Sequence, residues 1–529
     1  MSQFSWYYIL AAKGIQKYIL QGDKLSLMIG GSELVENLPG RFLSDVLCEL
    51  KQCEGSDYIV LSRTAGCARL LFREKTPPFQ LAEIMPLLVS LYCPGVDIVQ
   101  SVCEITDGLP KTMENAERQM KIRRNYPNPV YPIPGPLVER TPRTGLPKVG
   151  FLNRSEGEPA DDAMLKKDKA ASEARNTLKE KIFGSDQSPI RLALDFNELA
   201  PEETDYIAIV HADANGLGKT VMRFIEDRKD APNEKIIGDY KKFSLAIEDA
   251  TKLVARNAFN RIPPIKKEGN DPYFLFRPLI CAGDDFTAVL QAKDAFSFAE
   301  YFLANYPRQI SQNMKSAGLD SLENVFISAC IGISFIKPAF PFAQAYELCE
   351  SLCKYAKEET KRRYSALAFW RVTSHMLSDF NTIRDRELAS GNLCLTMMPY
   401  VIDNDRDDSF PTIYQLRQLA SSINDESVPR GSFNRLLGDL QQSETLAKQG
   451  FQRVIDVARR RDKPQQEAIE QVLINLSKIT NNTSMNAECL FKIIPNDAKK
   501  RNPPMLATPI HDALELLDAG TVFAEESIK

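Results

Sequence analysis

The sequence predicts an α+β protein with two ferredoxin-like modules, each of order β-α-β-β-α-β, followed by a helical C-terminal region. Two observations lead to this class. Between residues 206 and 286, two apolar runs each end in aspartate and glycine, and strand and helix patterns of the same order occur twice along the chain. At 529 residues the chain is too long for one ordinary core, so we expect several domains.

The composition is that of a globular protein, with 43% hydrophobic and 26% charged residues. A formal net charge of −4 gives no global sign of nucleic-acid binding, although a local basic groove remains open. The eleven cysteines form no regular framework and no secretion signal is evident, which favours reduced thiols in a cytoplasmic protein. No apolar stretch is long enough to span a bilayer, so we expect no membrane partner.

We assign residues 1–104 to the first module. In order, we expect a strand from Trp6, helices starting at Gly14 and Met28, a hairpin over Tyr58–Phe72, a helix over Phe79–Tyr92 and a strand over Asp97–Cys103. The hairpin tip, Thr64-Ala65-Gly66, lacks carboxylates, so we expect no metal in this module. Ser32 follows two glycines near an expected helix start, where free N–H groups attract anions. It is therefore a candidate nucleotide contact, and close helix packing is the alternative.

Residues 105–204 form a connecting segment. Proline is dense from Tyr126 to Pro147, which excludes regular structure there, and a polar helix is expected over Ala163–Phe183. No cysteine occurs between Cys103 and Cys281. Because a structural zinc ion needs about four soft or imidazole ligands, we predict no zinc in this segment.

Residues 205–374 form the second module. The run from Ile207 to Val210 predicts a buried strand that leads to Asp213, and Gly283-Asp284-Asp285 is the expected tip of a hairpin. The remaining expected elements are a helix over Asp294–Lys315, a strand over Val325–Phe335, a helix over Phe342–Arg363 and a strand over Ala366–Val372. Cys349 and Cys353 have no further ligand at metal spacing, so we expect buried core thiols.

If the two strands lie side by side, three carboxylates converge: those of Asp213, Asp284 and Asp285. Such a cluster repels itself unless a cation lies within it, and hard oxygen ligands suit Mg²⁺ or Mn²⁺. Two such ions about 4 Å apart can activate a hydroxyl and stabilise the leaving oxygen in a phosphoryl transfer. The backbone carbonyl of Ala214, beside Asp213, is a further candidate ligand.

Several residues around these carboxylates are expected to contact a nucleotide. The chain from Gly216 to Lys219 can approach phosphates closely, and Asn215 and Gly283 flank the carboxylates. Lys357 and Lys361 lie at the basic end of the helix that begins at Phe342, from which lysine can reach a triphosphate. For Lys357, the alternative is an ion pair with Glu350 or another acidic neighbour on a solvated face.

Three motifs carry a family resemblance: Ala-Asp-Ala-Asn-Gly-Leu-Gly from Ala212, Ala-Gly-Asp-Asp from Ala282, and Tyr355-Ala356-Lys357. They resemble the catalytic palm of the large polymerase-like and cyclase-like subunit of type III CRISPR effector complexes. Gly-Ile-Gln-Lys-Tyr-Ile from Gly14 and Gly-Gly-Ser-Glu-Leu from Gly30 resemble the non-catalytic palm of the same family. Asn215 departs from that family, which commonly has aspartate there.

This chain also departs in two ways from domains that members of the family carry. Many members carry an N-terminal HD nuclease domain, which needs clustered His and Asp ligands, but the three histidines, His211, His375 and His511, lie far apart in the sequence and nothing precedes the first palm, so we expect no nuclease. Members often carry a zinc knuckle between the palms, whose cysteines this chain lacks. His211 is expected to pack near the site without a direct chemical role.

Residues 375–529 resemble the helical C-terminal domain of the family. The clearest helical segments are Ile413–Ile423, Asn434–Val457, Pro464–Leu476 and Asp512–Leu517. Two basic runs, Arg459–Arg461 and Lys499–Arg501, are candidate contacts to RNA or a sister subunit, and solvated helix ends are the alternative.

The carboxylates themselves argue for metal-dependent transfer of a nucleotidyl group, in which a 3′-hydroxyl attacks an α-phosphate and pyrophosphate leaves. The resemblance implies ATP as the substrate and a cyclic oligoadenylate, or a related cyclic nucleotide, as an antiviral messenger. One alternative is a structural subunit that holds guide RNA, target RNA and sister CRISPR subunits with weak or no catalysis. A template-directed polymerase is less favoured, because no fingers or thumb of polymerase size can be placed.

Overall fold

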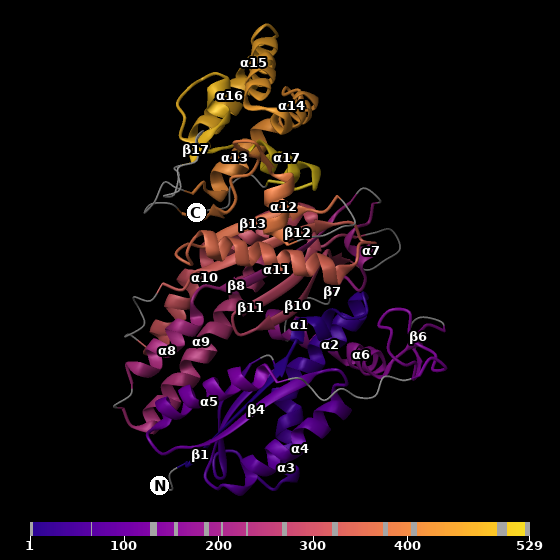
Figure 1. The fold of residues 1–529 in the computed structure, drawn as a ribbon, viewed down its shortest axis with the longest axis vertical. Coiled ribbons are helices and arrows are strands. Elements are labelled where there is room, and N and C mark those ends of the chain that lie inside the picture. The colour runs from indigo at the N-terminus through magenta and orange to yellow at the C-terminus, as the bar shows by residue number, and fades with distance from the viewer. Residues whose placement is uncertain are drawn as a thin grey trace.

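A computed structural model of the chain describes residues 4–64, 66–126, 135–152, 157–184, 190–202, 205–228, 231–266, 272–319, 326–373, 379–403, 410–494 and 505–523. The two modules and the C-terminal region follow one another along the long axis of the molecule (Figure 1). Part of the proline-rich segment, the basic run Lys499–Arg501, Ala65 and His375 lie outside the described residues.

The first module is the expected ferredoxin-like unit, with a four-stranded sheet of order β2-β3-β1-β4. Its strands are β1 (Trp6–Lys13), β2 (Tyr58–Thr64), β3 (Cys67–Phe72) and β4 (Asp97–Glu104). β1 is central and buried along nearly its whole length, which its run of apolar residues allows. The helices are α1 (Ile15–Leu20), α2 (Leu25–Asn37), the π-turn η1 (Leu38–Phe42), α3 (Leu43–Glu49) and α4 (Thr76–Tyr92).

The second module repeats this topology in its first four strands, and the complete sheet has the order β10-β11-β8-β12-β13-β16. The strands are β8 (Ile207–Ala214), β10 (Phe276–Ala282), β11 (Asp285–Gln291), β12 (Ala329–Ile336), β13 (Ala366–Arg371) and β16 (Tyr400–Val401). β8 pairs antiparallel with β11 on one side and β12 on the other. The predicted strand, hairpin and order are therefore confirmed, and β16 extends the sheet beyond residue 374.

The described part of the second module contains the helices α8 (Leu217–Glu226), α9 (Asn233–Phe259), α10 (Ala292–Ser316) and α11 (Phe342–Glu359). The sequence reading included α10 and α11 but did not single out α9. α9 and α10 lie side by side against the sheet, where Phe259 packs on Phe298 with ring centroids 4.8 Å apart. Cys349 and Cys353 are buried in α11, and their thiols donate to backbone carbonyls of the sheet, as core thiols do.

The connecting segment contains α5 (Leu109–Arg124), the pair β5 (Gly150–Phe151) and β6 (Pro159–Ala160), α6 (Asp162–Phe183), α7 (Phe196–Leu199), and β7 (Arg191–Leu192), which pairs with β9 (Tyr273–Phe274). α6 packs closely on α2. A Cβ at Gly30 would lie 1.8 Å from the carbonyl oxygen of Lys167, so this contact requires glycine. The Thr144 hydroxyl lies 2.5 Å from Asp161 Oδ2, and Asp161 caps α6, so polar bonds hold this turn of the connecting segment.

The C-terminal region is mainly helical, with α12 (Phe380–Glu387), α13 (Ile413–Ile423), α14 (Arg430–Gln442), α15 (Glu444–Arg459), α16 (Lys463–Thr480), the 3₁₀ turn η3 (Ala487–Leu490) and α17 (Ile510–Asp518). The segment expected as one helix over Asn434–Val457 is two helices. Ser443 is extended between them, and its hydroxyl accepts the Leu446 N–H to cap α15. A small sheet, unexpected because its strands are so short, joins β14 (Ala389–Ser390), β15 (Leu393–Cys394), β18 (Met505–Ala507) and β17 (Lys492–Ile494).

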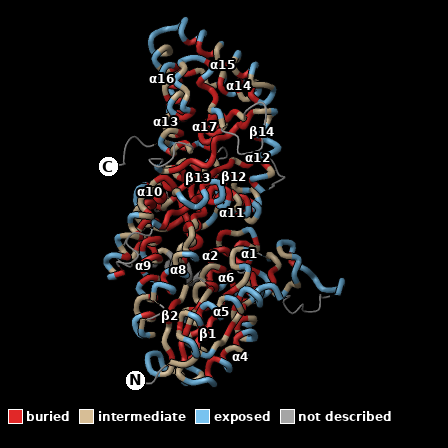
Figure 2. Tube along the Cα trace, turned by 60° about the vertical axis from the view of Figure 1, so that its left-hand side comes forward, coloured by how far each residue is buried: buried red, intermediate tan, exposed pale blue. Residues whose placement is uncertain are grey.

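Buried residues continue from the first module through the second to the C-terminal region, as the red trace in Figure 2 shows. The Ser32 hydroxyl of α2 donates to the Leu279 carbonyl of β10 and so joins the two modules directly. Within the described ranges, no helix combines the length and the apolar character needed to cross a membrane.

Candidate active site between the two modules

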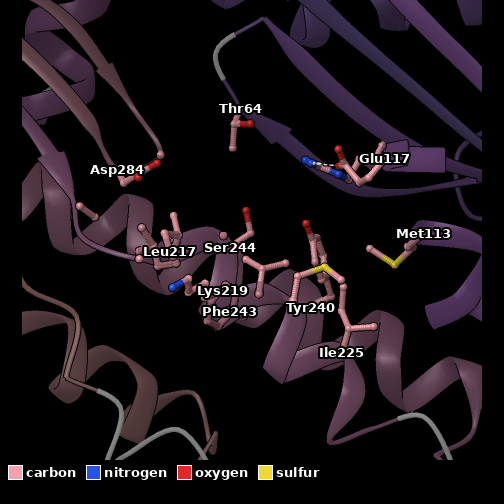
Figure 3. A pocket seen from close by; sticks show the side chains of 18 of the residues that line it. Thr64, Met113, Glu117, Leu217, Lys219, Ile225, Tyr240, Phe243, Ser244 and Asp284 are labelled. Carbon is pink, nitrogen blue, oxygen red and sulfur yellow. Dashed lines mark hydrogen bonds and ion pairs between the residues drawn. The ribbon is translucent and has the colours of Figure 1, made fainter. Parts of the chain in front are cut away.

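A cavity of about 1420 Å³ lies between the two ferredoxin-like modules, and both contribute to its wall. The first module supplies the start of α1 and the tip of its hairpin, and α5 of the connecting segment lines the same side. The second module supplies the end of β8, the β10–β11 tip, α8 and α9. The two hairpin tips approach each other: a Cβ at Gly283 would lie 3.9 Å from Thr64 Cγ2. Figure 3 shows Thr64 and Asp284 on opposite sides of this opening.

The three predicted carboxylates meet at the wall of this cavity. One oxygen from each of Asp213, Asp284 and Asp285 lies within 4.8 Å of the others. The strand register explains their meeting: β11 and β8 are antiparallel and Phe286 pairs with Ala212, so Asp285, just before Phe286, and Asp213, just after Ala212, lie at the same end of the sheet. Gly283 turns the chain at the tip with φ of +64°, a conformation that glycine adopts without strain.

Burial and mutual repulsion disfavour the charged forms of two of these acids. Burial, followed by the neighbouring Asp213, raises the pKa of Asp284 to about 6. Burial, followed by Asp284 and Asp213, raises the pKa of Asp285 to about 8. A divalent cation would relieve both effects. Three carboxylates and a nearby backbone carbonyl are the hard oxygen ligands that Mg²⁺ and Mn²⁺ prefer, so these residues fit the predicted metal site.

Lys357 reaches the same place from α11. Its ammonium forms an ion pair with the Asp213 carboxylate and donates to the Ala214 carbonyl oxygen at 3.1 Å. Only 5% of Lys357 is exposed, although it lines the cavity. The structure therefore gives Lys357 an acidic partner, but that partner is Asp213 of the site and not Glu350 on a solvated face.

Lys361 does not reach the cavity wall. It follows the end of α11 at φ +50°, and the exposed side chain is not among those that line the cavity. Arg362, one residue later, does line it. The prediction placed both residues on a continuing helix, whereas α11 ends at Glu359 and the chain turns.

Asn215 points away from the cavity. Its side chain is buried, and its amide nitrogen donates to the Ser328 hydroxyl at 2.9 Å and to the Tyr364 carbonyl at 3.0 Å. These bonds connect the end of β8 to the start of β12 and to the turn before β13. The predicted nucleotide contact at Asn215 is therefore corrected to a structural role, because inward hydrogen bonds fix the amide.

The glycine turn after Asp213 is open, as expected. Gly216 has φ +71° and starts α8, and a Cβ at Gly216 or Gly218 would meet no atom within 4 Å. Lys219 lies in the first turn of α8 and lines the cavity, as Gly216 and Gly283 do. Figure 3 shows Lys219 below the Asp284 tip. This arrangement leaves free backbone N–H groups and one lysine facing the space beside the carboxylates.

Ser32 lies outside this cavity wall, and the prediction that it contacts a nucleotide is not supported by its position. α2 begins at Leu25, so Gly30-Gly31-Ser32 lie inside the helix and their N–H groups are used within it. The Ser32 hydroxyl is engaged with Leu279, as described above. The alternative, close helix packing at these glycines, is what the structure shows.

Several residues of the cavity were not predicted. α9 contributes Tyr240, Phe243 and Ser244, and the Thr251 hydroxyl donates to the Gly283 carbonyl at 2.8 Å, directly below the hairpin tip. The apolar residues of α9 recur at helical spacing, which could have predicted the helix but not its position over the cavity. Across the cavity, Arg69 of β3 pairs with Glu117 of α5 at 2.7 Å, the dashed contact in Figure 3.

His211 packs beneath the site, as expected. Burial lowers the pKa of its imidazole to about 4, so the ring is neutral at neutral pH. Its Nδ1 lies 3.1 Å from the Thr287 hydroxyl, between β8 and β11. His211 is absent from the residues that line the cavity, which is consistent with a packing role.

The repeated ferredoxin-like topology and the carboxylates at a strand end and hairpin tip together define a palm-type protein. Residues 206–366 match the family model of the Cas10/Cmr2 second palm domain. The second module is thus similar to the second palm domain of Cas10/Cmr2, as its motifs predicted, and the match is confined to this module. No curated protein matches the chain.

One solved structure extends the similarity in fold over nearly the whole chain. A Csm1-Csm4 cassette in complex with cA3 aligns over 97% of this chain and 69% of that one, at 11% identity and a TM-score of 0.50. A Csm1-Csm4 cassette with AMPPNP aligns over 82% of this chain and 62% of that one, at 11% identity and TM-score 0.49. Csm1 in T.onnurineus aligns over 90% and 70%, at 13% identity and TM-score 0.44. At 11% identity, the first of these alignments shows a similarity of fold alone.

Proposed function

We propose that the protein is a metal-dependent nucleotidyltransferase that joins nucleoside triphosphates, with ATP as substrate and a cyclic oligoadenylate or related cyclic nucleotide as product. One observation carries the proposal: three carboxylates of a Cas10-like palm meet within 4.8 Å at the wall of a large cavity. The cavity, at about 1420 Å³, exceeds the roughly 300–1,000 Å³ of a small-molecule site, so it has room for two nucleotides.

The residues of the site have separate roles in the proposed reaction. Asp213, Asp284 and Asp285, with the Ala214 carbonyl, would hold the Mg²⁺ or Mn²⁺ ions that acidify the attacking 3′-hydroxyl and stabilise the leaving pyrophosphate. The N–H groups at the start of α8 and the ammonium of Lys219 bind phosphate oxygens from one side. Gly216 and Gly283 leave space for the nucleotide to come close to the carboxylates. The bond between the α- and β-phosphates breaks as the 3′-oxygen bonds to the α-phosphorus.

The names of the similar structures support the choice of substrate. They hold Csm1 with AMPPNP, with ATP and with the cyclic products cA3 and cA4. They also pair Csm1 with Csm4, so we propose that this chain works with sister subunits, guide RNA and target RNA of a type III CRISPR complex in the cytoplasm. The basic run Arg459–Arg461, at the exposed end of α15, is a candidate RNA or subunit contact.

To test the proposal, the protein is incubated with each labelled nucleoside triphosphate and Mg²⁺ or Mn²⁺. The rate of product formation is measured, and the products are identified by their mass. The double variant Asp284→Asn with Asp285→Asn should lose at least a hundredfold in rate, because the metal ligands are removed without a change in side-chain size. Asp249→Asn is the matched control, since that carboxylate is 62% exposed on α9 and does not line the cavity. Equal rates for the double variant and the control would refute the proposal.

The same assay distinguishes the proposed enzyme from a second candidate function, a binding subunit without catalysis. If the protein forms no product with any nucleotide, alone or with target RNA and sister subunits, it acts as a binding subunit of the complex. The ion pair of the buried Lys357 with the partly exposed Asp213 is the observation that favours keeping this second function, because it satisfies one carboxylate without any metal.

A further inference from the structure

Lys357 contacts two atoms that the proposed metal site needs. Its ammonium is paired with the Asp213 carboxylate, and it lies 3.1 Å from the Ala214 carbonyl oxygen. Asp284 and Asp285, by contrast, form no ion pair with any lysine or arginine in the part of the chain that the structure describes. The Lys357 ammonium is therefore paired directly with Asp213 and acts on Asp284 and Asp285 only from a longer distance.

We propose that Lys357 is an exchangeable counter-ion: it fills one of the two cation positions in the nucleotide-free protein and leaves it when a triphosphate and the second metal ion bind. The inference rests on the proposed function, because it concerns the same site. It predicts that the site loads its metals in order, the first at Asp284 and Asp285 and the second only with the nucleotide.

The Lys357 ammonium and the second metal ion cannot both bind beside Asp213, because their positive charges repel each other. An ammonium and a divalent ion that share the Asp213 oxygens and the Ala214 carbonyl would lie within a few ångströms of each other, and their charges would repel strongly at that distance. One of them must leave. The metal alone has to displace the lysine from an ion pair that is already formed, whereas a triphosphate offers the lysine a new anionic partner.

The Lys357 side chain can reach a triphosphate bound in the same cavity. Lysine carries its charge on a flexible four-carbon stem, and Lys357 lines the cavity together with Lys219 and Arg362. A triphosphate bound between these three cations would draw the Lys357 ammonium off Asp213 without a change in α11. The same movement releases the Ala214 carbonyl, which becomes available to the second ion.

Binding of Mn²⁺, followed by electron paramagnetic resonance and calorimetry without turnover, tests the inference. The wild-type protein should bind one tight ion alone and two in the presence of a non-hydrolysable ATP analogue. Lys357→Met should bind the second ion at least tenfold more tightly than wild type in the absence of nucleotide. Lys354→Met is the matched control: it removes the same charge one turn earlier on α11, from a side chain that is 73% exposed and paired with Glu358, and should leave both isotherms unchanged.

Two results would overturn the inference. One is a wild-type protein that binds two ions equally tightly without nucleotide, and the other is a Lys357→Met variant whose second ion binds no more tightly than in Lys354→Met. The first measurement needs no variant, so the test survives if Lys357→Met fails to fold. A failure of the proposed function looks different: no product forms, while the ordered binding of Mn²⁺ persists.

Discussion

We expect the Thr251 hydroxyl to fix the position of the β10–β11 hairpin tip and, with it, of the carboxylates that the tip carries. Thr251 is fully buried in α9, and its Oγ1 lies 2.8 Å from the Gly283 carbonyl and 3.1 Å from the Ile247 carbonyl of its own helix. Thr251→Val keeps the shape and removes the hydroxyl. The Gly283 carbonyl then loses its donor, and the tip that carries Asp284 is no longer fixed from below.

The expected size of the effect follows from this hydrogen bond. Leaving a buried polar group without a partner costs about 1–3 kcal/mol. If this cost falls on the geometry of the tip, the affinity for Mn²⁺ drops by about tenfold, since 1.4 kcal/mol is one factor of ten. We expect Thr251→Val to show this loss in a calorimetric titration, with a matching fall in the rate of product formation at limiting Mn²⁺.

Thr480 supplies a matched control for the same substitution. It is also buried, and its Oγ1 lies 2.7 Å from the Leu476 carbonyl one turn earlier and 3.0 Å from the Cys489 carbonyl, but in the C-terminal region. Thr480→Val should lower the free energy of unfolding by a similar amount and leave Mn²⁺ affinity unchanged. If the two variants had the same Mn²⁺ affinity as the wild type, Thr251 would have no role in positioning the tip.

Three further predictions concern pH and packing. Because the metal-free pKa of Asp285 is raised to about 8, protons compete with metal, and the apparent affinity for Mn²⁺ should rise between pH 6 and pH 8, as measured by titration at each pH. Burial raises the folded-state pKa of Asp512 to about 7, far above its ordinary value of 3.8. The folded protein therefore holds this proton more tightly than the unfolded chain, and the free energy of unfolding should fall as pH rises from 4 to 7. Asp512→Asn should remove this contribution in urea titrations. Gly30→Ala should lower the melting temperature, since its Cβ would lie 1.8 Å from the Lys167 carbonyl oxygen, whereas Gly438→Ala, with no atom within 4 Å, should keep or raise it.

The three carboxylates of the proposed metal site were predictable because their positions depend on local signals. A buried apolar run that ends in aspartate marks the end of a strand, and glycine followed by two aspartates between two such runs marks a hairpin tip. The order of the elements then places the two strands side by side. Asp213, Asp284 and Asp285 could therefore be brought together from the sequence, and the structure places them as expected.

Sequence patterns did not determine where a polar side chain points. Ser32 and Asn215 lie in motifs of the right kind, but one bonds to Leu279 across the modules and the other to Ser328 inside the sheet. Each partner is more than a hundred residues away along the chain. Local propensities do not contain this information, because such bonds form only when separate elements pack.

The sequence by itself determined the two ferredoxin-like modules, the helical C-terminal region and the acidic residues at the strand ends, since these follow from periodicity and turn chemistry over a few residues. Only the tertiary structure decided that the two hairpin tips face each other across one cavity, that α9 lines it, and that Lys357 neutralises Asp213. The physical reason is that burial and ion pairing depend on contacts between distant segments, and the chain makes those contacts only once its modules are assembled.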